Sequence, residues 1–362
     1  MANRFWVGGT GLWSGSNTAN WSATSGGTSG ASVPVATDDV YFDANSGGGT
    51  CTVSTASQGG QSLSFTGVSG TSNYTGNLIQ SGLGSLQVAG NLTYSPSMTT
   101  INVSVLLNGI STHTITTNGI FDSLVNYINI LTISGAGTTV YGLVGKVYMA
   151  TFSHIFGTFN TNNYDIYANT FSGTIANAKF LNLGSSTIFI ASAGTNPYLP
   201  QNVTINYGTS TIRYINTSNT NLTIAFGGGT YYNMWFDRGA STATMLLNTT
   251  GTTTFLGSFI DTGTAAHILQ FQALRTWNFS DFKVRGSAGN LITIQSNNPG
   301  VNYAIFNKSP LGLVSCDYVA VNTINGGNAN TWYAGANSTL TTTAGWIATP
   351  PPPRKLGAAG AG

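Results

Sequence analysis

The nine aspartates are the side chains best suited to acid–base chemistry, because the chain contains no glutamate. Glycan-cleaving enzymes need two carboxyl groups about 5–9 Å apart. Asp38 and Asp39 share a turn, where such side chains usually cap backbone groups, and Asp43 follows nearby. Asp237 is interpreted as half of a neutralised surface pair with Arg238. We expect no catalytic residue, but the sequence leaves open whether acids on neighbouring coils meet.

Metal and nucleotide chemistry also lacks its usual residues. His113, His154 and His267 have no cysteine, histidine or acid at the spacing of metal ligands. The chain has no Gly-x-x-x-x-Gly-Lys-Ser/Thr phosphate loop and no Gly-x-Ser-x-Gly nucleophile motif. The sequence therefore predicts no metal site and no cofactor.

The composition indicates which elements carry these residues. Hydrophobic residues make up 41% of the 362 positions, but charged residues make up only 6%, against roughly 25% in ordinary soluble proteins. Thr, Asn, Ser and Gly take the place of the Glu and Lys that populate exposed helix faces. Such a chain favours strands and turns over helices.

Charge and hydropathy exclude several classes of partner. The net charge is +2, and the basic residues form no stripe of the kind that nucleic-acid binding needs. No stretch approaches the uninterrupted apolar length of a membrane span, so we expect no transmembrane helix. The first residues, MANRFWVGG, do not resemble a signal peptide, so we expect synthesis in a cytoplasm.

Short apolar strands recur along the chain, each bounded by Gly, Asn, Pro or Ser. In residues 281–347 they fall at 291–294, 303–306 and 314–321, about every eleven to thirteen residues. Two internal echoes support repetition: LNLGSSTI at 181–188 returns as INYGTSTI at 205–212, and NVTI at 202–205 returns as NLTI at 221–224. Both shifts, about 19 to 24 positions, fit one coil of a parallel β-helix. We predict an all-β solenoid with little or no α-helix.

Tryptophans mark both ends of this predicted solenoid. The terminal coils have no neighbour to bury their apolar faces, so they need caps. We assign Trp6, Trp13 and Trp21 to an N-terminal cap, and Trp332 and Trp346 to a C-terminal one; either group could also dock another subunit. The predicted segments are a cap at 1–46, a β-helix body at 47–347 that closes with coil 281–347, and a Pro-rich flexible tail at 348–362.

The two cysteines bear on the same model. Cys51 belongs to the early part of the chain and Cys316 to the late part. In a solenoid whose coils advance about 4.8 Å each, they would sit near opposite ends. We predict two free, buried thiols.

One aromatic strand is a candidate contact surface. Residues 229–237, read as a regular strand, place Tyr231 and Trp235 on the face opposite Met234. Both faces cannot line one core, so Tyr231 and Trp235 are expected to meet a loop, another subunit or a sugar ring. Arg275 and Trp277 offer a weaker version of the same idea, with a cation–π pair as the alternative.

Several segments together resemble repetitive β-helical proteins of tailed bacteriophages and of bacterial surfaces. They include RFWVGGTGLWSGSNTANWSATSGG, SVPVATDDVYFDANSG, FNTNNYDIYANTFSG, LNLGSSTIFI, GNLITIQS and NTWYAGANSTLTTTAGWI. The resemblance covers almost the whole chain in patches, and these segments describe architecture rather than chemistry. It implies a virion appendage: a tail fibre, tail spike, or head fibre or decoration protein, often a homotrimer.

The sequence thus leads to a non-enzymatic virion structural protein as the first hypothesis. Its expected partners are further copies of itself, other virion proteins and a host-surface glycan, with neither nucleic acid nor membrane insertion. Two alternatives stay open: a glycan-degrading tail spike and an adhesin-like solenoid on a bacterial surface.

Overall fold

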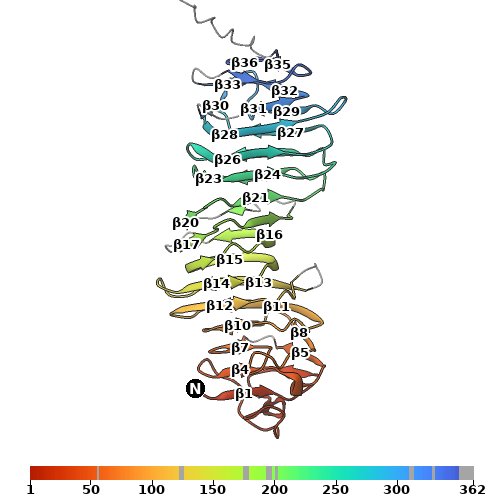
Figure 1. Ribbon diagram of the computed structural model, residues 1–362, viewed down its shortest axis with the longest axis vertical. Helices are drawn as coiled ribbons and strands as arrows, with labels where there is room; N and C mark the ends of the chain where they lie inside the picture. The colour runs from red at the N-terminus through yellow and green to blue at the C-terminus, as the bar shows by residue number, and fades with distance from the viewer. Residues whose placement is uncertain are drawn as a thin grey trace, which may run out of the picture. The chain divides into compact units, whose positions relative to one another are not determined.

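A computed structural model describes residues 1–54, 57–121, 126–173, 179–192, 198–199, 203–309, 314–327 and 331–349. The chain forms a parallel β-solenoid, as predicted, and divides into two compact units, Met1–Asn216 (unit 1) and Thr217–Gly362 (unit 2). Figure 1 shows the strands of each unit as successive rungs. The helical segments among the described residues are two short 3-10 turns, η1 (Thr18–Asn20) and η2 (Ala44–Ser46).

Unit 1 has two stacks of strands. The first contains β1 (Asn3–Trp6), β3 (Trp21–Ser22), β4 (Asp39–Tyr41), β7 (Leu63–Ser64), β10 (Leu92–Thr93), β12 (Thr112–Thr116), β14 (Val140–Val144), β17 (Lys179–Asn182) and β20 (Val203–Asn206). The second contains β2 (Gly11–Trp13), β5 (Thr50–Val53), β6 (Gln58–Gly60), β8 (Asn77–Gln80), β9 (Ser85–Val88), β11 (Thr100–Leu107), β13 (Tyr127–Ser134), β16 (Ile166–Gly173), β18 (Thr187–Ile190), β19 (Tyr198–Leu199) and β21 (Thr211–Tyr214). The long β15 (Val147–Asn160) belongs to both, because it pairs with β14 and β17 as well as with β13 and β16.

Unit 2 is also built from stacks of parallel strands. One stack contains β23 (Thr230–Tyr231), β24 (Asn233–Phe236), β26 (Thr253–Asp261), β28 (Thr276–Arg285), β30 (Ala304–Lys308), β31 (Val314–Asp317) and β33 (Ile324–Gly326). A second sheet contains β22 (Leu222–Ala225), β25 (Thr244–Asn248), β27 (His267–Phe271), β29 (Ile292–Ser296), β32 (Val319–Asn322) and β35 (Thr339–Thr341), and β34 (Trp332–Tyr333) pairs with β36 (Trp346–Ile347).

The strand register tests the two sequence echoes. The echo of LNLGSSTI in INYGTSTI is confirmed as one coil, because Leu181 pairs with Ile205 and Ile188 pairs with Ile212. The echo of NVTI in NLTI stays a prediction, because its two copies belong to different units: β20 pairs with β17 in unit 1, and β22 pairs with β25 in unit 2.

Coil length also varies more than predicted. Val140 pairs with Thr158 across a short coil, whereas Leu63 pairs with Leu92 across a considerably longer one. Loops of different length account for the spread.

Period-two alternation builds the core. In β11 every second side chain is buried, from Ile101 to Leu107. Each unit adds aromatic stacks to this aliphatic filling, such as Phe255 against Phe279, with ring centroids 5.4 Å apart. Fully burying a large apolar side chain stabilises by about 1.5–3 kcal/mol. Because each coil presents such residues to the next, the stabilisation is spread along the stack.

The predicted tryptophan caps are present. Trp6, Trp13 and Trp21 are fully buried and pack around Phe42 in unit 1. Trp332 and Trp346 are buried in the last coils of unit 2, with ring centroids 5.0 Å apart. The predicted boundary after residue 46 falls inside unit 1, where β2 already pairs with β5. Residues 350–362 of the predicted tail lie outside the described residues.

The two cysteines are free and buried, as predicted, with Cys51 in unit 1 and Cys316 in unit 2. Burial raises the pKa of the Cys51 thiol well above its usual value and that of Cys316 to about 12. The thiolate is the reactive form, so both should resist alkylation in the folded protein. We expect a thiol reagent at pH 8 to modify neither cysteine in buffer and both in denaturant. Rapid labelling of one cysteine before unfolding would contradict the burial of that residue.

Candidate binding groove on unit 2

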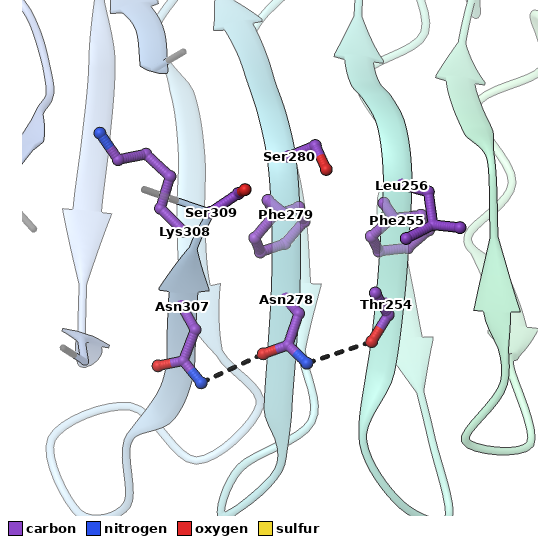
Figure 2. A pocket seen from close by; sticks show the side chains of 9 residues that line it. All are labelled: Thr254, Phe255, Leu256, Asn278, Phe279, Ser280, Asn307, Lys308 and Ser309. Carbon is purple, nitrogen blue, oxygen red and sulfur yellow. Dashed lines mark hydrogen bonds between the residues drawn. The ribbon is translucent and has the colours of Figure 1, made fainter. Parts of the chain in front are cut away.

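A groove crosses the outer surface of β26, β28 and β30 in unit 2 (Figure 2). Its volume is about 260 Å³, and its polar lining includes Thr254, Asn278, Asn307 and Lys308. These side chains come from strands that lie side by side, because Thr254 pairs with Asn278, which pairs with Asn307. Alternation sends their neighbours inward and leaves the polar residues outside.

Thr254, Asn278 and Asn307 form a ladder of side-chain hydrogen bonds across the three strands. The Asn307 Nδ2 donates to Asn278 Oδ1 at 3.1 Å, and Asn278 Nδ2 donates to Thr254 Oγ1 at 3.1 Å (Figure 2). An amide has two donor hydrogens and two acceptor lone pairs, so each asparagine keeps hydrogen-bonding capacity for a ligand. The ladder is uncharged, and its donors and acceptors suit hydroxyl and amide groups.

A bulge shapes one wall of the groove. The register of β26 against β28 shifts between Phe255 and Ser258, so that Leu256 and Gly257 both lie outside the regular alternation. Leu256 is 55% exposed, which places an aliphatic surface beside the amide ladder. Bulges are common where a sheet bends to re-aim a side chain.

Beyond the bulge lies a small charged network. Lys283 Nζ is 3.2 Å from Asp281 Oδ2 and donates to Ser258 Oγ at 2.9 Å. The Ser258 hydroxyl lies 3.4 Å from the same carboxylate. Lys283 therefore neutralises Asp281. This network contains no second carboxylate, so it lacks the pair of acids that a glycan-cleaving site needs.

Two predicted contact residues are buried instead, and these predictions are wrong. Tyr231 is only 2% exposed and donates its hydroxyl to the Phe226 carbonyl at 2.7 Å. The alternation breaks between β23 and β24, where Tyr232 and Asn233 are both half-exposed, so Tyr231 turns into the core. Trp277 is fully buried and packs edge-on against Phe271.

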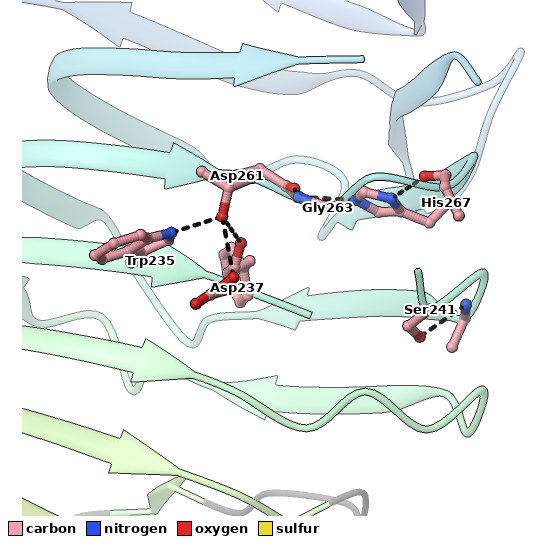
Figure 3. Close-up of polar contacts among 10 residues, drawn as sticks. Trp235, Asp237, Ser241, Asp261, Gly263 and His267 are labelled. Carbon is pink, nitrogen blue, oxygen red and sulfur yellow. Dashed lines mark hydrogen bonds and ion pairs between the residues drawn. The ribbon is translucent and has the colours of Figure 1, made fainter. Parts of the chain in front are cut away.

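The other two predicted contact residues remain at the surface. Trp235 is half-exposed, and its indole Nε1 donates to Thr262 Oγ1 at 2.8 Å (Figure 3). Arg275 is half-exposed as well. The structure therefore separates Trp235 from Tyr231 and Arg275 from Trp277, one member of each pair lying outside and the other inside.

Most described aspartates have structural contacts. Asp38 accepts from the Ala2 backbone N–H at 3.0 Å, and Asp43 completes a capping box on η2. Asp165 accepts from the Thr187 N–H at 2.8 Å. Burial tends to raise the pKa of Asp317. The hydrogen bonds that Asp317 accepts from the side chain and backbone of Asn337 nevertheless hold this pKa below its usual value. Asp122 lies outside the described residues.

For the predicted surface pair of Asp237 and Arg238, the structure contradicts the surface position of Arg238. Arg238 is only 3% exposed, and its Nη2 donates to the carbonyls of Ser218 and Thr220. It lies close enough to Asp261 for an electrostatic interaction. The buried guanidinium is thus stabilised by two backbone carbonyls that accept from it and by the nearby charge of the Asp261 carboxylate.

Sequence reasoning missed the contact between Asp261 and His267. His267 Nε2 lies 2.9 Å from Asp261 Oδ2, with both side chains buried (Figure 3). The two residues lie at either end of a loop between two sheets, so no strand or helix periodicity links them.

Metal chemistry finds no support in the described part of the chain. No group of three or more His, Cys, Asp or Glu there could hold an ion. No helix in the same residues is long and apolar enough to cross a membrane.

Comparison of the sequence with protein-family models, and of the chain with curated proteins and solved structures, finds no match.

Proposed function

We propose that this chain is a structural protein of a tailed-bacteriophage particle, a β-helical fibre, spike or decoration protein that contributes to attachment. It is made in the host cytoplasm, assembles as a homotrimer with other virion proteins, and meets a host-surface glycan. Its work is mechanical rather than enzymatic. This proposal rests on the resemblance of its segments and on the physical character of its coils.

The observation that carries the proposal is the uncharged cross-rung bonding of a parallel solenoid. Asn77 donates to Thr50 across one pair of rungs, and Asn278 donates to Thr254 across another. Such neutral bonds do not depend on ionic strength, whereas ion pairs at a surface weaken in salt. A protein exposed to changing media outside a cell benefits from that independence.

The decisive experiment is mass spectrometry of purified particles. We expect peptides of this chain in particles banded by density, at a constant ratio to the major capsid protein. Peptides found only on the surface of uninfected bacteria would instead favour the adhesin. Antibody labelling in electron micrographs would then distinguish a head position from a tail position.

The groove is the proposed point of attachment. Replacing Leu256 with arginine places a long, charged side chain beside the amide ladder, and we expect binding of the purified protein to host cells to fall at least tenfold. Val301 is 70% exposed and is not among the residues lining the groove, so Val301→Arg is the matched control. Equal binding by both variants would place attachment elsewhere.

Release of reducing ends from host capsule or lipopolysaccharide tests the enzymatic alternative. We expect no release above that of a heat-denatured sample. Release that is lost in Asp281→Asn would favour a glycan-degrading spike, because Asp281 is the carboxylate in the network beyond the bulge.

A further inference from the structure

A buried charged cluster joins three successive coils of unit 2. Its first coil contributes the carbonyls of Ser218 and Thr220, which accept from Arg238 Nη2 at 2.8 and 3.2 Å. Arg238 belongs to the second coil, and the third contributes Asp261 and His267. Arg238 follows the end of β24, Asp261 is the last residue of β26, and His267 is the first residue of β27; Figure 3 shows Asp261 and His267.

The hydrogen bonds of His267 determine its protonation. Its Nδ1 lies 2.8 Å from the Ala265 carbonyl, which can only accept, so Nδ1 carries a proton. Its Nε2 lies 2.9 Å from the Asp261 carboxylate. Either His267 donates this second bond as an imidazolium, or Asp261 is protonated and donates it. The nearby Arg238 guanidinium and the Gly263 N–H, which donates to Asp261 Oδ1 at 2.8 Å, both favour the carboxylate.

We infer that His267 is a buried imidazolium and that its pair with Asp261 is a pH-sensitive fastener, a bond between the two ends of the loop that joins β26 to β27. This loop also contacts the preceding coil through its backbone: the Thr262 N–H donates to Phe236 O at 3.0 Å, and the Thr264 N–H donates to Gly239 O at 2.7 Å. When His267 loses its second proton, Asp261 faces an imidazole nitrogen that can no longer donate.

No other titratable side chain faces His267 from the described elements around it. On β29 its strand partner is Ile292, and β25 packs against β27 through pairs such as Thr244 with Ile268. The charges that act on it are those of Asp261, which is attractive, and Arg238, which is repulsive. Burial lowers the pKa of His267, but its bond to Asp261 and the charge of that carboxylate outweigh burial, so the pKa is raised.

The direction of the pH effect follows from this shift. A histidine whose folded pKa exceeds its unfolded value of about 6.5 binds its proton more tightly in the folded state. Its stabilising contribution is complete below about pH 6.5 and is lost as the pH rises through the folded pKa. Each unit of pKa difference changes the folding equilibrium up to about tenfold. The bond between His267 and Asp261 therefore weakens as the solution becomes alkaline.

Nitrogen-15 NMR of histidine-labelled protein tests the protonation directly, because the chain has three histidines. Burial lowers the pKa of His113, and lowers that of His154 to about 4. As the pH is lowered we expect His267 to become an imidazolium before the other two histidines, and this first imidazolium signal should be missing in His267→Gln. Three neutral imidazoles in the folded protein would overturn the inference.

Hydrogen exchange tests the fastener itself. Between pH 7 and pH 10, after correction for intrinsic exchange rates, the backbone amides of the loop at 262–266, between β26 and β27, should lose protection at least tenfold in the wild type. In His267→Gln, which has no imidazole proton to lose, protection should already be low and vary little with pH. His113→Gln, the control, should follow the wild type. Protection that is the same in all three proteins at every pH would refute the fastener.

Discussion

Replacing Trp13 with alanine is expected to lower the free energy of unfolding of unit 1 by about 3–5 kcal/mol. Trp13 is fully buried, and its ring centroid lies 5.0 Å from that of Trp21 and 5.9 Å from that of Phe42. The first coils have few neighbours to close over the cavity that alanine would leave. Urea denaturation followed by circular dichroism measures the loss without depending on tryptophan fluorescence.

Two variants on the same strand separate packing from other causes. Trp13→Phe keeps a ring in place and removes an indole Nε1 that has no hydrogen-bond partner among the described residues, so it should cost far less than alanine. Leu12 is 43% exposed on the neighbouring position of β2, so Leu12→Ala should change stability little. A similar loss in all three variants would mean that the cap is not held by ring packing.

Replacing Gly208 with alanine is expected to destabilise unit 1 by about 2–5 kcal/mol. Gly208 has a φ of +52°, in the left-handed region that disfavours side chains. A Cβ there would also collide with the carbonyl oxygen of Gly184, one coil earlier. Because that oxygen accepts the Thr209 N–H at 2.8 Å, moving it disturbs the hydrogen bonding between the two rungs.

Gly119 provides the matched control for this substitution. Its φ of +76° is also left-handed, but a Cβ at Gly119 would meet no atom within 4 Å. Gly119→Ala should therefore cost only the backbone term, about 1–2 kcal/mol. Equal urea midpoints for the two variants would show that the close approach of the coils at Gly208 carries no energy.

The fold class could be predicted because its signals are local. Alternating apolar residues in segments such as β11, and glycine or asparagine where the backbone turns, are visible in a few consecutive residues. The echo of LNLGSSTI in INYGTSTI worked for the same reason: Gly184 and Gly208 occupy the same left-handed turn in successive coils. The tryptophan caps followed from the need of any solenoid to close its ends.

The contact surface could not be predicted in the same way. Tyr231 and Trp235 share a face only if the strand is regular, and the break at Tyr232 sends Tyr231 into the core. The groove beside Leu256 depends on a comparable irregularity, the bulge in β26. One residue more or less between two strands reverses the direction of every following side chain.

The sequence by itself determined that this chain folds as a parallel solenoid with aromatic ends and buried thiols. Only the tertiary structure decided which polar residues meet: Arg238 with the carbonyls of the preceding coil, and Asp261 with His267. The physical reason is that coil length varies, as the short coil from Val140 to Thr158 and the long one from Leu63 to Leu92 show in unit 1. A local pattern specifies which side chains point inward, but the loops set which residues of successive coils lie side by side.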